Sequence, residues 1–374
     1  MGGWGLDELP GYFYWGGTTD LKAFLEENGY EVYVASVGAV SSNWDRAIEL
    51  YYQIKGGQVD YGAEHSKNFG HLQRPEGRFY DHPLYPQWDA DHPVHLVGHS
   101  LGGQTIRMLS ALMAGRDPRL RSVLKNGDGE PFTPGSGWIK SITTLSTPHN
   151  GTCIYTILND PVRIMTMVLV LAGIDPDADT PVDKLYNFDL EQWYLKREPA
   201  ETLEQYLVRV TDTLGETKDI STWEISIAGA QEFNERVNSS TVDPDAYYFS
   251  YANQKTFPVA LGLFYLPDPL INPLLIPLAA YLGILPVKDP FHIGPRWHEN
   301  DGLVNTISMR APLLGCSDRC QVNRNRPKKG VWNYMGKLHW DHGDIIGQSI
   351  NTPVKVKKLK NFYLRLAEML QSLE

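Results

Sequence analysis

Residues 93–115 read PVHLVGHSLGGQTIRMLSALMAG, and this stretch decides the fold class. It opens with a short run rich in β-branched residues, passes through a turn flanked by glycines, and continues as an amphipathic helix that stops at Gly115. A strand that leads through a tight turn into a helix is the building unit of a parallel sheet. The stretch therefore predicts an α/β protein.

The same alternation recurs along the chain. Residues 17–37 predict a helix, ended by Gly29, and then the strand EVYVASV. Further strands are predicted in WIKSITTLSTP at 138–148 and in DAYYFSYAN at 245–253. Strands that alternate with helices indicate a mostly parallel central sheet covered on both faces.

Two intervals break this rhythm, because residues 52–90 and 147–220 are long, aromatic, and helical or irregular. We interpret them as insertions in a single domain that covers residues 1–374. The most apolar stretches are Ile164–Ile174, which is short for a membrane span, and Pro267–Pro286, which carries a charge and several prolines. We therefore expect no transmembrane helix.

Charge and the first residues limit the partners. The formal net charge is −10, which gives no reason to expect nucleic acid as a partner. The short basic run KVKKLK at 355–360 predicts only a solvated helix start. The opening residues MGGWGLDELPGYF contain neither the basic nor the apolar region of a signal peptide, so no export signal is visible. The oligomeric state is left open.

The turn within the first stretch predicts a nucleophile. Gly98-His99-Ser100-Leu101-Gly102 fits the pattern G-x-S-x-G between a strand and a helix, which raises the serine on a strained turn. Small residues are needed on either side, because a Cβ there would collide with the neighbouring strand and helix. The N–H of Leu101, at the start of the helix, is the expected donor to a substrate oxyanion.

A serine hydroxyl needs an imidazole to take its proton and a carboxylate to orient that imidazole. In this architecture the order along the chain is Ser, Asp or Glu, His. We choose His342, in a loop before the last helix, with His339 as the alternative. For the carboxylate we choose Asp301, on an Asn-Asp-Gly turn. The alternatives that remain open are Asp318, Asp289, Glu299 and Asp341.

Seven motifs together resemble a known family: GHSLGGQT, SSNWDRA, VDYGAEH, STPHNGT, RWHENDGLVNT, KKGVWNYMG and FYLRLAEML. The chain is similar from about residue 3 to 373 to bacterial thermostable lipases of the Bacillus and Geobacillus type, which are related to staphylococcal lipases. The resemblance implies an α/β-hydrolase fold, secretion, and hydrolysis of triacylglycerols at an oil–water interface through Ser100, Asp301 and His342. The alternatives are a short-chain carboxylesterase and a catalytically impaired lipid-binding protein of the same fold.

The resemblance also implies two metal ions. A structural Zn²⁺ would hold the insertion at 52–90 through Asp45, His65, His71 and Glu191. The last of these is a glutamate where the family has an aspartate, and neutral imidazoles and carboxylates both suit zinc. A Ca²⁺ ion is expected near the catalytic histidine, with Asp344 as one ligand. The second carboxylate position falls near Ser349 or Ile350, which removes a charged calcium ligand.

Two further expectations come from the resemblance. The apolar run CIYTILNDPVRIMTMVLVLAGI at 153–174 is placed as a helical lid, the alternative being an ordinary buried helix. Family chains begin with an apolar strand and a loop that supplies the second oxyanion N–H. Met1 falls where that donor should be, so the N-terminal strand is expected to be missing and the start truncated.

Overall fold

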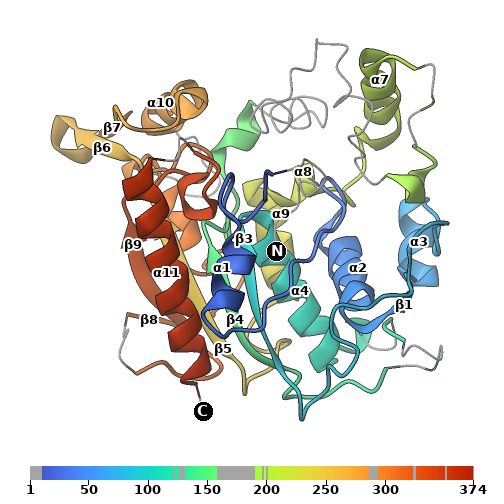
Figure 1. Cartoon of the computed structure of the whole chain (residues 1–374). Helices are drawn as coiled ribbons and strands as arrows, with labels where there is room; N and C mark the ends of the chain where they lie inside the picture. The colour runs from blue at the N-terminus through green and yellow to red at the C-terminus, as the bar shows by residue number, and fades with distance from the viewer. Residues whose placement is uncertain are drawn as a thin grey trace.

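The computed structural model describes residues 11–120, 123–125, 130, 132–157, 190–195, 198, 201–285, 294–322, 326–349 and 352–373. Its centre is a five-stranded sheet in which every neighbouring pair is parallel (Figure 1). In spatial order the strands are β3 (Val94–His99), β4 (Ile139–Leu145), β5 (Tyr247–Asn253), β9 (Trp332–Leu338) and β8 (Cys320–Gln321). The predicted α/β class and parallel sheet are confirmed.

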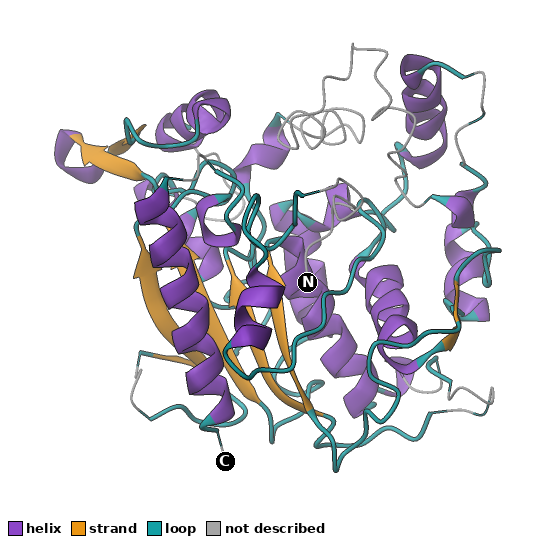
Figure 2. Cartoon of the chain, in the orientation of Figure 1, coloured by secondary structure: helices purple, strands orange, loops and turns teal. Residues whose placement is uncertain are grey.

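Helices cover both faces of this sheet (Figure 2). On one face α2 (Asn43–Lys55) and α4 (Leu101–Ala114) share a core with the β5 residue Tyr248. On the other, α1 (Leu21–Glu27) and α11 (Pro353–Gln371) share a core with the next residue, Phe249. Successive residues of a strand point to opposite faces, and Tyr248 and Phe249 are both buried, so β5 is covered on both sides.

The remaining elements lie around this core. The helices are α3 (Ala63–Phe69), α7 (Leu203–Leu214), α8 (Ser221–Glu224), α9 (Ile227–Arg236) and α10 (Ile276–Ile284). Two antiparallel hairpins pair β1 (Gly57–Gln58) with β2 (Phe79–Tyr80), and β6 (Thr256–Val259) with β7 (Phe264–Pro267). Short 3₁₀ turns are η2 (Pro118–Leu120), η3 (Cys153–Thr156), η4 (Glu191–Trp193), η5 (Ala260–Gly262), η6 (Pro273–Leu275), η7 (Pro295–Trp297), η8 (Thr306–Met309) and η9 (Asp344–Ile346).

One predicted strand is wrong. The segment EVYVASV at 31–37 belongs to none of the named strands. Residues 30–35 and β3 both line a cavity of about 440 Å³, and none of the described strands pairs with the segment as a ladder. Among the described strands, β3 therefore has a neighbour on one side only.

The predictions for the apolar stretches have different outcomes. No helix among the described residues combines the length and the apolar character needed to cross a bilayer. The run Pro267–Pro286 contains the end of β7, η6 and α10. Most of the expected lid, from residue 158 onward, lies outside the described residues.

Candidate active site and metal site

Ser100 lies at the tip of the turn between β3 and α4. Its backbone φ is 53°, in the left-handed region that residues other than glycine rarely adopt. A Cβ on Gly98 would lie 2.5 Å from the carbonyl oxygen of Gly102, and one on Gly103 only 2.0 Å from Oγ1 of Thr147. The turn therefore requires glycine at these positions and presents the serine at the C-terminal edge of the sheet.

A continuous chain of hydrogen bonds joins three of the predicted residues. The hydroxyl of Ser100 lies 3.0 Å from Nε2 of His342, whose Nδ1 lies 2.8 Å from Oδ2 of Asp301. Asp301 is fully buried, and its Oδ1 accepts hydrogen bonds from the N–H groups of Leu303 and Val304. The backbone N–H of His342 also donates to the Asp301 carbonyl. The carboxylate is thus fixed to hold the imidazole with Nε2 facing the serine.

Two residues that sequence reasoning missed, His99 and Tyr14, hold the backbone of His342 in place through hydrogen bonds. Nε2 of His99 donates to the His342 carbonyl at 3.0 Å, and its Nδ1 accepts from the Tyr14 hydroxyl at 2.8 Å. Burial lowers the pKa of His99 well below its usual value, so its ring is neutral with the proton on Nε2. His99 is one of the variable positions of G-x-S-x-G, and no sequence signal marks it or Tyr14.

The structure does not bring the alternative residues to the serine. His339 is exposed and lies 3.1 Å from Asp268 instead. Glu299 pairs with Lys337, and Asp318 accepts from the N–H of Ser239. Asp341 binds backbone N–H groups of its own loop. Asp289 lies outside the described residues, as does Met1, the expected position of the second oxyanion donor. Leu101 is the first residue of α4, so its N–H has no carbonyl partner one turn earlier in the helix.

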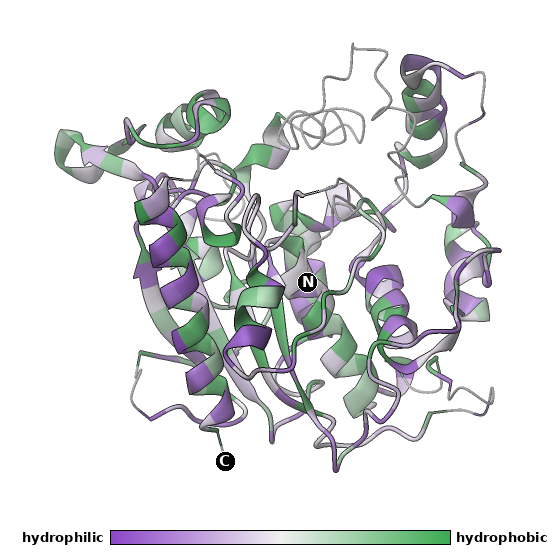
Figure 3. Cartoon of the chain, in the orientation of Figure 1, coloured by the Kyte–Doolittle hydropathy of each residue, from purple (hydrophilic) through white to green (hydrophobic). Residues whose placement is uncertain are grey.

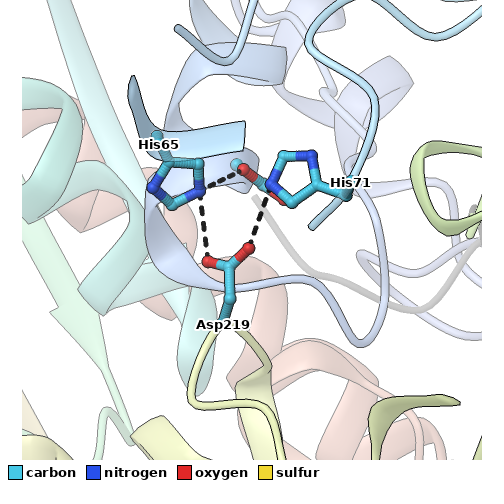
Figure 4. Close-up of side chains that lie close together, drawn as sticks. His65, His71 and Asp219 are labelled. Atoms are coloured by element: carbon cyan, nitrogen blue, oxygen red, sulfur yellow. Dashed lines mark hydrogen bonds and ion pairs between the residues drawn. The ribbon is translucent and has the colours of Figure 1, made fainter. Parts of the chain in front are cut away.

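A second group of side chains meets where the expected insertion at 52–90, which carries His65 and His71, contacts two other segments of the chain (Figure 4). Asp45 lies in the first turn of α2, His65 on α3, and His71 just after the left-handed Gly70 that ends α3. The fourth member is Asp219, which precedes α8. The ligand atoms of all four lie within 4.8 Å of one another, and all four residues except His65 are buried.

The geometry of this group fits a tetrahedral zinc ion. Nε2 of His65 lies 3.1 Å from Asp45 and 3.2 Å from Asp219, and Nε2 of His71 lies 3.2 Å from Asp219 and 3.9 Å from Asp45. Ligands about 2.0 Å from one Zn²⁺ ion at tetrahedral angles would be about 3.3 Å apart. Nε2 of His71 and Oδ2 of Asp219 are buried, and apart from their 3.2 Å contact with each other neither has a hydrogen-bond partner among the described residues. A buried polar atom in that position needs an ion or a proton.

The charges in the group also suit a divalent cation. Nδ1 of His71 donates to the Leu72 carbonyl, which points the Nε2 lone pair into the group. Burial opposes charging of His65, but its hydrogen bonds to the two aspartates outweigh burial and raise its pKa to about 9. Burial and the charge of Asp219 raise the pKa of Asp45 to about 6. Without an ion, bound protons balance the two buried aspartates. A divalent cation would balance the two carboxylate charges and leave the buried group neutral.

The prediction of Glu191 as a ligand is wrong in this structure. Its carboxylate lies 3.6 Å from the Arg78 guanidinium, and the next residue, Gln192, points to the group and donates to Asp45. Asp219 takes the fourth position because an isolated bridge between Ser41 and Ile220 brings the segment before α8 alongside the start of α2. This pairing joins residues far apart in sequence, so no local pattern reveals it.

The residues near Asp344 do not fit calcium. Nζ of Lys355 lies 2.7 Å from Oδ1 of Asp344, and Oδ2 of the same carboxylate accepts the N–H of Asp341. Oδ1 of Asp341 accepts the hydroxyl of Ser349 at 2.7 Å, and its Oδ2 accepts the N–H of Asn272. Calcium requires several free oxygens, and an ammonium group already supplies the counter-charge here. Both oxygens of Asp344 thus already have a partner, and the structure does not support this residue as a calcium ligand.

Comparison with known proteins gives the class of this chain. It belongs to the family described as Lipase-like, C-terminal domain, which matches residues 6–374. Curated relatives include a lipase of Staphylococcus epidermidis, 36% identical over 363 residues, and lipase 1 of Staphylococcus aureus, 34% identical over 378 residues. These alignments cover 95% and 96% of this chain but 50% and 51% of the relatives. The chain thus spans about half the length of these relatives.

Solved structures agree over nearly the whole chain. EstA from Clostridium botulinum is 37% identical, with a TM-score of 0.84, and the match covers 98% of this chain and 84% of that one. Lipase 1 from Pelosinus fermentans is 35% identical, with a TM-score of 0.81 and coverage of 100% and 96%. Staphylococcus hyicus lipase is 30% identical, with a TM-score of 0.77 and coverage of 99% and 92%. The resemblance to staphylococcal lipases is confirmed.

Proposed function

We propose that this chain is a lipase that hydrolyses carboxylic ester bonds of acylglycerols through an acyl-enzyme on Ser100. The observation that carries the proposal is the hydrogen-bond chain from Ser100 through His342 to the buried Asp301. It sits on a strand–turn–helix whose backbone raises the serine, the setting in which this pattern is catalytic. The staphylococcal and Pelosinus relatives, which are named lipases, favour lipid esters as the substrate.

The reaction follows from the positions of these side chains. Oγ of Ser100 attacks the ester carbonyl while Nε2 of His342 takes its proton, and the negative oxygen that forms faces the N–H of Leu101 at the start of α4. The intermediate collapses, and the leaving alcohol receives the proton from His342. Water then attacks the acyl-enzyme, again giving its proton to His342, and the acid leaves as Ser100 is restored. Asp301 stabilises the imidazolium in both halves.

We further propose that Asp45, His65, His71 and Asp219 hold a structural zinc ion. Bound there, zinc would supply four bonds that tie the start of α2 to α3 and to the segment before α8. The group uses none of the residues in the hydrogen-bond chain of Ser100. A zinc ion held there would therefore stabilise the insertion and would not contact the ester. Secretion remains part of the proposal, on the resemblance to bacterial lipases.

Active-site labelling tests the proposal. Ser100→Ala is expected to abolish labelling by a fluorophosphonate probe, and His342→Ala to lower kcat/KM for p-nitrophenyl butyrate by about 10⁴–10⁶. His339→Ala is the matched control, because this histidine is exposed and bound to Asp268, and it should keep full activity. If the unaltered chain neither labels nor hydrolyses the ester, the enzyme proposal fails and a lipid-binding protein of the same fold remains.

A second measurement separates a lipase from a short-chain esterase. Initial rates are compared on p-nitrophenyl esters of increasing acyl length and on an emulsified triacylglycerol. A lipase is expected to hydrolyse the long esters and the emulsion. Activity confined to short, soluble esters would favour the carboxylesterase.

A further inference from the structure

Exposed apolar side chains concentrate in one part of the molecule. Of the large apolar side chains exposed among the described residues, more than half lie between residues 257 and 284, in the β6–β7 hairpin, α10 and the link between them. They are Phe257, Leu261, Leu263, Phe264, Leu266, Leu270, Leu274, Ile276 and Ile284. We call this part the apolar projection. Figure 3 shows it as a mainly hydrophobic lobe that stands out from the body at the upper left.

The tip of the hairpin adopts a strained backbone. Ala260, Leu261 and Gly262 have φ values of 49°, 58° and 84°, so three consecutive residues are left-handed although only one is glycine. Such a conformation costs free energy and persists where the surroundings or a function require it. It turns the Leu261 side chain fully into solvent, with a relative exposure of 107%. A leucine in this position buries no apolar surface and therefore does not stabilise the fold.

The apolar projection is nevertheless packed as a fixed unit. A Cβ on Gly283 of α10 would lie 1.9 Å from the carbonyl oxygen of Tyr265, so the helix and the hairpin touch backbone to backbone. The ring of His298 bridges them, with Nδ1 2.6 Å from the Leu263 carbonyl and Nε2 2.8 Å from the Leu285 carbonyl. The exposed side chains are therefore presented in a defined arrangement.

The apolar projection is joined to both loops that carry the partners of Ser100. The side chain of Asn300, next to Asp301, donates to the carbonyl of Ala279 in α10. The N–H of Asn272 donates to Asp341, the residue before His342. Since β6 begins only three residues after β5 ends, the hairpin lies at the C-terminal edge of the sheet, where Ser100 also lies (Figure 1).

The charges of the apolar projection favour an uncharged surface. Between residues 256 and 285 the only charged residue is Asp268, which lies 3.1 Å from His339 and 3.8 Å from Lys255. The exposed side chains are aliphatic or phenylalanine, with no charge for a specific partner to recognise. The whole chain carries a net charge of −10, so an anionic membrane would repel it. A convex lobe of this kind fits the acyl region of a neutral lipid layer.

We propose that the apolar projection is a docking surface for an uncharged lipid layer, into which the hairpin tip and the exposed face of α10 insert. The inference rests on the proposed function, because an enzyme that acts on lipid esters gains by holding its site at the lipid surface. Docking at this lobe places the C-terminal edge of the sheet, with Ser100, close to the layer.

Vesicle binding tests the assignment directly. The full chain is mixed with phosphatidylcholine vesicles, with and without phosphatidylglycerol, and the bound fraction is measured by co-sedimentation. Leu261→Asp is expected to lower the partition coefficient at least about 10-fold, and Leu261→Asp/Leu270→Asp roughly 100-fold, since burying one leucine in apolar surroundings is worth about one such factor. Both leucines are exposed, so the folded core keeps its packing.

The control and the soluble ester separate this inference from the proposed function. Val322→Asp likewise puts an aspartate in place of an exposed aliphatic residue, here of 62% exposure and just after β8. Because β8 pairs with the first residues of β9, it lies toward the N-terminal ends of the strands, whereas the hairpin lies at their C-terminal ends. This variant should bind vesicles like the unaltered chain. All variants should hydrolyse p-nitrophenyl butyrate at unchanged rates. If the unaltered chain does not hydrolyse p-nitrophenyl butyrate, the proposed function is overturned. The vesicle measurement still shows whether the apolar projection binds a lipid layer.

Three results would overturn the docking. The first is equal vesicle binding by the unaltered chain and Leu261→Asp/Leu270→Asp. The second is binding that requires phosphatidylglycerol and weakens with salt, which would make charge the cause. The third is a dimer of the unaltered chain that Leu261→Asp converts to monomers without change in vesicle binding, since the lobe would then be a contact between two copies.

Discussion

Two regions of this molecule each bury a pair of carboxylates, and they neutralise them differently. In the first, Asp45 and Asp219 face His65 and His71. In the second, Asp341 and Asp344 lie in the loop that carries His342. There the ammonium group of Lys355 binds Asp344, and a hydroxyl and backbone N–H groups occupy Asp341. Carboxylate oxygens and imidazole nitrogens of the first group are placed to bind an ion, whereas the ammonium group of Lys355 balances the charge of Asp344 in the second.

The two pairs differ in how well their partners suit a metal ion. Burial and a neighbouring carboxylate raise the pKa of Asp45 and of Asp341 alike, so the pKa direction alone does not separate the two regions. The difference lies in the partners. A metal ion and a proton compete for the same imidazole nitrogen, whereas a lysine ammonium competes with the metal ion for the carboxylate. Three predictions test this difference.

The largest effect is expected from zinc. After removal of metal by a chelator and dialysis, addition of Zn²⁺ at about 1,000 times its Kd should raise the free energy of unfolding by about 4 kcal/mol, measured by denaturant titration. Ca²⁺ should have no comparable effect, because the ligand set contains two imidazoles. Asp219→Asn is expected to lose this response and Glu191→Gln to keep it. A response that follows Glu191 instead would contradict the assignment of the fourth ligand.

Sequence reasoning succeeded where a local constraint decides the geometry. The turn at Ser100 needs glycines within three residues of the serine, so it left a pattern in the sequence. Chain order placed the carboxylate and the histidine after the serine but left several carboxylates open, and the family resemblance singled out Asp301. The fold class followed from the same alternation of strands and helices.

It failed where contacts between distant segments decide the outcome. Asp219 reaches the metal group through the pairing of Ile220 with Ser41. Lys355, expected to be a solvated charge at a helix start, turns back to Asp344. The segment 31–37 has the composition of a strand, but residues 30–35 and β3 line a cavity and do not pair with each other. In each case the residue type was visible, but its partner was set by the fold as a whole.

The second prediction removes the internal cation. Lys355→Met leaves the carboxylate of Asp344 buried without its counter-charge, and is expected to lower the free energy of unfolding by about 1–3 kcal/mol, since the lysine itself is partly exposed. Added Ca²⁺ should recover part of this loss in the variant and have no effect on the unaltered chain. Lys357→Met, at an exposed position of the same helix, is the control and should change little. Calcium stabilisation of the unaltered chain would show that the ammonium does not replace the ion.

The smallest effect is a pH dependence confined to the histidine-containing region. In the metal-free chain the pKa of His65 is raised to about 9, above its value of about 6.5 in the unfolded chain. The folded state therefore holds an extra proton between these values, and its contribution to stability is complete below pH 6.5 and lost as the pH rises through 9. The slope should approach about 1.4 kcal/mol per pH unit for one proton. With zinc bound, both imidazoles are neutral, so the free energy of unfolding should stay level between pH 7.5 and 9.

Denaturant titrations at several pH values, with and without zinc, measure both slopes. A slope that persists with zinc bound, or in a His65→Asn variant, would place the titrating group elsewhere.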